Sequence, residues 1–60
     1  MNDIATRDRL IEEDKITYGL YKMSEMDCGD YIKIFYATSR YDCWVEIIYK
    51  DNSKHILEER

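Results

Sequence analysis

Proline is absent from this chain of 60 residues, and glycine occurs only twice, at Gly19 and Gly29. Both residue types weaken helices and strands, so few positions force regular structure to stop. Disordered segments are poor in aromatic and β-branched residues, whereas this chain is 45% apolar and 13% aromatic. The composition therefore predicts a folded chain. At 60 residues it is a single small domain with a thin core.

Cysteine and histidine are also scarce, with Cys28, Cys43 and His55 as the only examples. Two cysteines are too few for the disulfide framework of a small secreted domain. No CxxC or HxxxH pair is present, so we expect no metal and no cofactor. We expect Cys43 to act as a small hydrophobic residue and His55 to be a solvated surface residue. The sequence also lacks a glycine-rich phosphate loop and a GxSxG motif, so we expect that it is not an enzyme.

Long apolar runs are missing as well, including the apolar segment of a signal peptide at the N-terminus. We therefore expect a cytoplasmic protein that does not enter a membrane. Acids outnumber bases by 13 to 9, which gives a net charge of −4. This excess disfavours nucleic acid as a partner, because phosphate binding requires clustered Lys and Arg. The excess lies wholly in residues 1–30, either as a solvated helix and acidic loop or as an acidic face for a basic partner.

The first segment predicts a helix over about residues 2–14, with Asn2 or Asp3 as the N-cap and a narrow apolar stripe. Alternation of apolar residues then predicts strands over about residues 16–23, 31–38, 43–50 and 54–58. Two of these have helical alternatives. Ile16, Leu20 and Met23 also share a helix face, and Ser53 could cap a terminal helix. Residues 24–30 are the clearest loop.

These elements predict an α+β domain in which the N-terminal helix packs on a three- to four-stranded antiparallel β-meander. One helix covers only one face of such a sheet, yet both faces carry apolar residues. If Ile32, Ile34, Val45 and Ile47 meet the helix, the outward residues are Tyr31, Phe35, Trp44 and Ile48. If the faces are reversed, Tyr36, Tyr49 and several isoleucines face outward. The sheet could curl around this surplus, a second copy could cover it in a homodimer, or a different protein could bind it.

The leading hypothesis is a non-catalytic protein-binding module. Its small size is typical of a phage or mobile-element inhibitor that blocks a host protein, for example in defence or nucleic-acid processing. Surplus aromatic residues would supply the contacts and loop acids would imitate phosphates. The candidate partner-binding residues are Tyr31, Phe35, Tyr36, Trp44, Ile48, Glu25, Asp27 and Asp30.

Two other functions remain open. The chain could be an oligomeric binding protein or sponge for a nucleotide-like small ligand, because its six tyrosines could stack on bases. It could also be a small subunit of a bacterial regulatory assembly.

Overall fold

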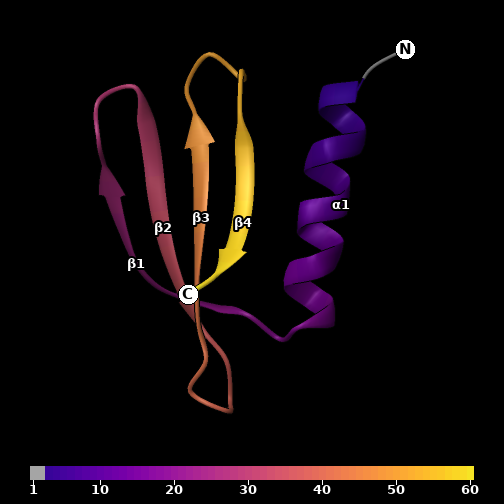
Figure 1. Cartoon of the computed structure of the whole chain (residues 1–60), viewed down its shortest axis with the longest axis vertical. Helices are drawn as coiled ribbons and strands as arrows, with labels where there is room; N and C mark the ends of the chain where they lie inside the picture. Colours follow the sequence, from indigo (N-terminus) through magenta and orange to yellow (C-terminus); the bar gives the residue numbers. More distant parts are fainter. Residues whose placement is uncertain (1–2) are drawn as a thin grey trace.

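The computed structural model describes residues 3–60, which form one helix and four strands. The elements are α1 (Asp3–Thr17), β1 (Tyr21–Asp27), β2 (Tyr31–Ala37), β3 (Cys43–Tyr49) and β4 (His55–Glu59). The strands form one antiparallel sheet in the order β1-β2-β3-β4. Figure 1 shows α1 lying beside β4 at one side of this meander. The predicted α+β fold, a helix packed on an antiparallel meander, is confirmed.

The helix is longer than the sequence predicted, and this overturns the first part of the expected strand over residues 16–23. Ile16 and Thr17 form the last turn of α1. The N–H of Gly19 donates to the carbonyl of Ile16 at 3.1 Å, and the N–H of Leu20 donates to that of Lys15 at 2.9 Å. This pair of bonds is a Schellman cap, and Gly19 has the positive φ (64°) that the cap requires. Gly19 therefore ends a helix instead of interrupting a strand. Asn2, one of the two expected N-caps, lies outside the described residues.

The expected loop over residues 24–30 is also shorter in the structure, because β1 continues to Asp27. Only Cys28–Asp30 connect β1 to β2, and Gly29 has a positive φ of 89° there. The Asp27 side chain accepts a hydrogen bond from the Gly29 N–H at 2.9 Å, which closes the turn. The three later strands lie within one residue of their expected bounds, and residues 55–59 form a strand, not the alternative helix.

Strand register assigns each side chain to one of two faces, because directly paired residues point to the same side. One face, which we call the helix face, carries the residues that α1 contacts. Its β2–β4 residues are Ile32, Ile34, Tyr36, Trp44, Glu46, Ile48, His55, Leu57 and Glu59. The opposite side is the open face. The register places on it Tyr21, Ser24, Met26, Tyr31, Lys33, Phe35, Ala37, Cys43, Val45, Ile47, Tyr49, Ile56 and Glu58.

This register corrects the groups of residues proposed from the sequence. Ile32 and Ile34 cannot meet the helix together with Val45 and Ile47, because Val45 pairs with Phe35 and Ile47 with Lys33. The alternation predicted within β2 and within β3 is confirmed, but the predicted phase of one strand relative to the other is wrong. A shift of one residue in that phase exchanges the two faces of a strand.

Candidate functional site

A carboxylate lies between the helix and the sheet. Glu46 of β3 has no exposed surface, although both of its neighbours on the helix face of β3, Trp44 and Ile48, are largely apolar. Its Oε1 accepts a hydrogen bond from the Tyr36 hydroxyl at 2.6 Å and lies 2.8 Å from Nζ of Lys15. Its Oε2 contacts Nε2 of His55. Both carboxylate oxygens are thus satisfied, as burial of a charge requires.

His55 links Glu46 to the helix and is not the solvated residue that the sequence predicted. Only 7% of its side chain is exposed. Its Nδ1 lies 2.7 Å from Oδ1 of Asp8, and Arg7 donates to the same Asp8 oxygen at 3.2 Å. A carboxylate oxygen only accepts hydrogen bonds, so both contacts of His55 are hydrogen bonds when each ring nitrogen carries a proton. The ring then bridges two acids on different elements.

The electrostatics of this network favour its charged form. Burial acts to raise the pKa of Glu46, but hydrogen bonds from Lys15, Tyr36 and His55 outweigh burial and hold the pKa below 4.5. Burial acts to lower the pKa of Lys15, yet its hydrogen bonds with Glu12 and Glu46 raise that pKa. The hydrogen bond from His55 lowers the pKa of Asp8. Each charge is therefore stabilised by its neighbours.

The network leaves little for chemistry on a substrate. Glu46 has no exposed surface and no free oxygen, and both ring nitrogens of His55 are occupied. A general base needs a free lone pair within reach of a substrate proton, which neither residue offers. Among residues 3–60, no group of three or more His, Cys, Asp or Glu side chains could hold a metal ion. The arrangement instead ties α1 to β3 and β4.

The helix achieves this by turning polar residues inward. Asp8, Ile11 and Lys15 follow the spacing of one helix face, and all three contact or face the sheet. Ile16 is 82% exposed. An apolar inner stripe on the helix predicts no inward charges, so Glu46, Lys15 and Asp8 could not be found from that pattern. One signal was available: Glu46 stands alone between apolar neighbours on its face, so it needs a cation and a donor from another element.

The open face, in contrast to this polar network, carries few charged side chains. Its large side chains are aromatic or aliphatic, and Lys33 and Glu58 are the only charged residues that the register places on it. Packing among these side chains buries Val45 and stacks the rings of Tyr31 and Tyr49, whose centroids lie 5.3 Å apart. Tyr21 and Met26 remain 49% and 53% exposed. The side chains of this face therefore cover its centre at Val45, whereas its edge at β1 stays exposed.

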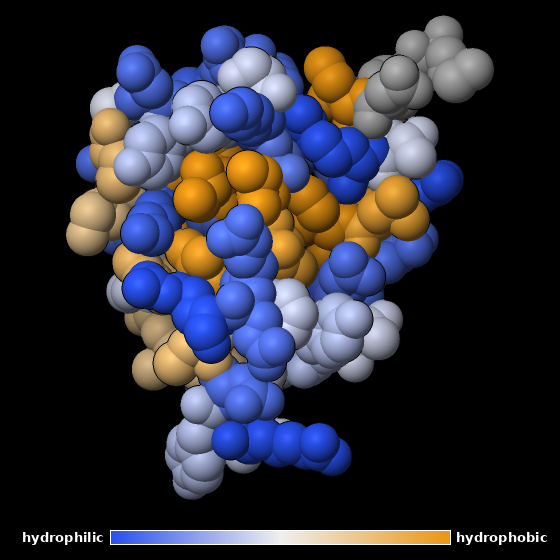
Figure 2. Space-filling model, viewed as in Figure 1, coloured by the Kyte–Doolittle hydropathy of each residue, from blue (hydrophilic) through white to orange (hydrophobic). Residues whose placement is uncertain are grey.

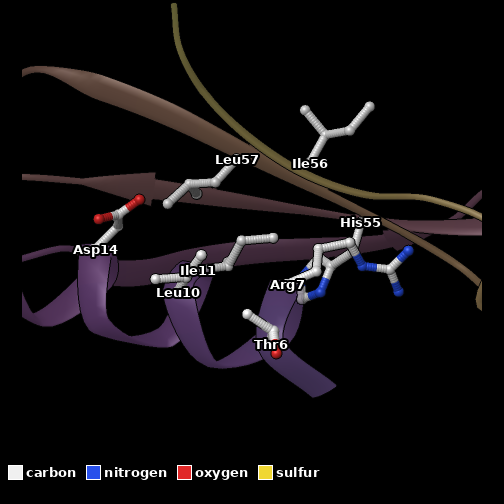
Figure 3. Close-up of a pocket in the computed structure, with 8 residues that line it drawn as sticks. All are labelled: Thr6, Arg7, Leu10, Ile11, Asp14, His55, Ile56 and Leu57. Atoms are coloured by element: carbon white, nitrogen blue, oxygen red, sulfur yellow. The ribbon is translucent and has the colours of Figure 1, made fainter. Parts of the chain in front are cut away.

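A groove between α1 and β4 extends the apolar surface. Its main apolar lining residues are Leu10 and Ile11 of α1 with Ile56 and Leu57 of β4. In Figure 3, Leu57 lies above Leu10 and Ile11, whereas Ile56 projects from the other side of β4. Figure 2 shows apolar side chains gathered over β3 and β4 and toward α1, with hydrophilic side chains around them. Such a contiguous apolar area is typical of a contact surface.

The residues expected to bind a partner do not share one surface. Tyr31 and Phe35 lie on the open face, where Lys33 sits over the Phe35 ring. Tyr36, Trp44 and Ile48 lie on the helix face, which overturns the grouping of Trp44 and Ile48 with Tyr31 and Phe35. Tyr36 is buried, and Trp44 stacks on Tyr18 with ring centroids 4.8 Å apart.

The three candidate acids are not a free acidic face either. Glu25 and Asp27 pair in the register with Ile34 and Ile32, on the helix side of β1. Glu25 bonds to Lys22 at 2.7 Å, and Asp27 bonds to Lys50 at 2.9 Å. Hydrogen bonds from the Gly29 N–H and from Lys50 lower the pKa of Asp27. Asp30 is exposed in the following turn. Glu25 and Asp27 thus lie on the opposite side of the sheet from Tyr31 and Phe35.

The remaining chemistry-bearing residues are dispersed. Cys28 is half-buried, and Cys43 is exposed, not buried as a small hydrophobic residue would be. Arg40 belongs to the β2–β3 connection, at the opposite end of the sheet from Lys50 and Lys54 (Figure 1). A second groove brings Arg40 close to Tyr18 and Trp44, but Asp42 and Glu59 line the same groove. The two acids disfavour a phosphate-bearing ligand there.

Comparisons with family models, curated proteins and solved structures found no match for this chain. No helix among residues 3–60 has the length and apolar character needed to cross a membrane.

Proposed function

We propose that this chain is a non-catalytic protein-binding module whose contact surface is the open face of its sheet. One observation carries the proposal: both faces of the sheet carry apolar side chains, but α1 lies on only one face, so the apolar side chains of the open face have no helix over them. A folded chain gains stability by placing its apolar face inward. Here the apolar residues of the open face are left for the surface of another protein to cover. Exposed Tyr21 and Met26 with half-buried Tyr31 and Phe35 are residue types that suit such contacts.

In its more specific form, the proposal is that the chain blocks a host protein by covering its surface, as a phage or mobile-element inhibitor would. Buried Glu46 and enclosed His55 offer no catalytic atom, so binding itself is the activity. The imitation of phosphates is not part of this proposal, because Asp27 is paired with Lys50 and lies on the opposite side of the sheet from Tyr31 and Phe35. Binding through the open face is expected to change little with salt.

The experiment compares the natural chain with Met26→Glu, which places a charge on the open face. The matched control is Ile16→Glu, which places the same charge on the exposed side of α1. Each chain is immobilised and exposed to a bacterial lysate, and captured proteins are quantified by mass spectrometry. The proposal expects a stoichiometric partner that Ile16→Glu retains and Met26→Glu loses.

Hydrogen exchange on the purified complex then locates the contact. The proposal expects protection of β2 and β3 on binding and, in the inhibitor form, loss of the partner's activity at equimolar chain. Equal capture by all three chains, or protection confined to α1, would contradict the open face as the contact surface.

A further inference from the structure

Two opposite charges on the open face, Lys33 and Glu58, form no ion pair within residues 3–60. The Nζ of Lys33 lies over the ring of Phe35, 5.4 Å from its centroid. Lys33 is on β2 and pairs with Ile47, whereas Glu58 is on β4 and pairs with Val45. The two residues are two strands apart and offset by two positions, or roughly 12 Å between their Cα atoms in an ideal sheet. They flank the centre of β3 on opposite sides.

We propose that the open face binds a second copy of this chain, in a two-fold dimer that pairs Lys33 of each copy with Glu58 of the other. This inference rests on the proposed function, since it keeps the open face as the contact surface, but it names a second copy of the chain in place of a host protein as the occupant. A two-fold axis that lies between two stacked sheets and crosses β3 between Val45 and Ile47 exchanges the positions of Lys33 and Glu58. In such an interface, residue i meets residue j and residue j meets residue i.

The same axis gives the interface the usual distribution of residue types. Ile47 meets its own symmetry mate at the centre, with Phe35 and Ile56 beside it, and Val45 lies buried beneath them. The charged pairs lie further out, as in interfaces with an apolar core and a polar rim. The chain carries a net charge of −4, which would oppose self-association. On the open face, however, one lysine balances one glutamate, so the two copies do not repel each other there.

The sheet edges are less suited to a second copy. β1 is an edge strand, but its register with β2 is interrupted between Lys22 and Ser24 by a bulge. Bulges and charged residues on edge strands hinder pairing between chains. The other edge strand, β4, lies beside α1. The open face is therefore the surface through which two copies can approach.

Sedimentation velocity over a wide range of concentration tests the dimer. We expect a mass near twice 7.3 kDa for the natural chain. Lys33→Glu and Glu58→Lys each bring like charges together, so each is expected to raise the dissociation constant about tenfold or more. The double exchange, Lys33→Glu with Glu58→Lys, restores opposite charges and is expected to return the dissociation constant close to the natural value. Glu59→Lys is the control, because Glu59 is the next residue on β4 and lies on the helix face.

Circular dichroism identifies any variant that fails to fold, and the double exchange then decides. A natural chain that stays monomeric at every concentration would overturn the dimer, and so would a dimer that the single variants do not weaken or the double exchange does not recover. The lysate experiment separates this failure from failure of the proposed function. A monomeric chain whose partner is lost with Met26→Glu would still be a protein-binding module.

Discussion

Lys15 of α1 and Glu46 of β3 form an ion pair with Nζ 2.8 Å from Oε1, and Glu46 is fully buried. The helix is thus attached to the sheet partly by charge, next to the apolar side chains that the same face of the sheet carries. Tyr36 and His55 complete the bonds of the carboxylate. Helix docking therefore depends on a small set of polar groups that must all be present.

Glu46→Gln is expected to destabilise the chain by about 3 kcal/mol, near the lower end of the range for breaking a buried ion pair. The substitution leaves Lys15 and His55 enclosed without their shared anion. The value is near the lower end because Lys15 keeps its bond to Glu12 at 2.7 Å. Urea unfolding followed by far-UV circular dichroism measures the loss. A loss of this size is a large fraction of the stability of a small domain. Lys15→Met, which leaves Glu46 with its other two partners, is therefore measured in parallel.

A double-mutant cycle separates the ion pair from simple packing. Lys15→Met with Glu46→Leu removes both charges at once, so the double variant is expected to lose less stability than the sum of the single losses. Glu12→Gln, which removes only an exposed contact of Lys15, is expected to change stability by less than about 1 kcal/mol. Additive losses in the cycle would show that the two charges are not coupled.

The stability of the folded chain is expected to fall at both low and high pH. The pKa of Glu46 is lower in the folded chain than its ordinary 4.5, so its stabilisation is complete above about pH 4.5 and is lost as the pH falls through the folded-state pKa. The pKa of Lys15 is raised above 10.5, so its stabilisation is complete below pH 10.5 and is lost at higher pH. Urea midpoints across this range test both limbs. Glu46→Gln should show a shallower acid limb, and an unchanged limb would contradict the assignment.

Trp44, the single tryptophan, provides a direct signal of helix docking because it stacks on Tyr18, just after the end of α1. Tyr18→Ala is expected to shift Trp44 emission to longer wavelength and to cost about 1 kcal/mol from the lost ring contact. Tyr41→Ala is the control, because Tyr41 is 89% exposed in the β2–β3 connection. Equal emission spectra for all three chains would show that the stack does not hold the helix end.

The strands could be predicted because a two-residue alternation is local: β2 and β3 were placed within one residue of their bounds. Two features could not be predicted in the same way. The end of α1 depended on whether Gly19 caps a helix or interrupts a strand, and the bonds that decide this join Gly19 and Leu20 to the preceding turn.

The buried network depends on residues far apart in the chain, since Asp8, Lys15, Glu46 and His55 come from three elements. The rule that charged residues lie on the surface is correct for most of them, but it fails for charged residues that are buried in pairs. Which cation meets Glu46 is decided by the tertiary structure.

Two isoleucines of α1 test which side of the helix faces the sheet. Ile11 is 8% exposed and Ile16 is 82% exposed, although they lie only five residues apart. Ile11→Ala is expected to cost about 2–5 kcal/mol, because it removes buried methyl groups beside the network. Ile16→Ala removes the same atoms from a solvated position and is expected to change stability by less than about 0.5 kcal/mol. Thermal and urea unfolding measure both. Similar losses at the two positions would mean that α1 docks through a different face, with Lys15 turned away from Glu46.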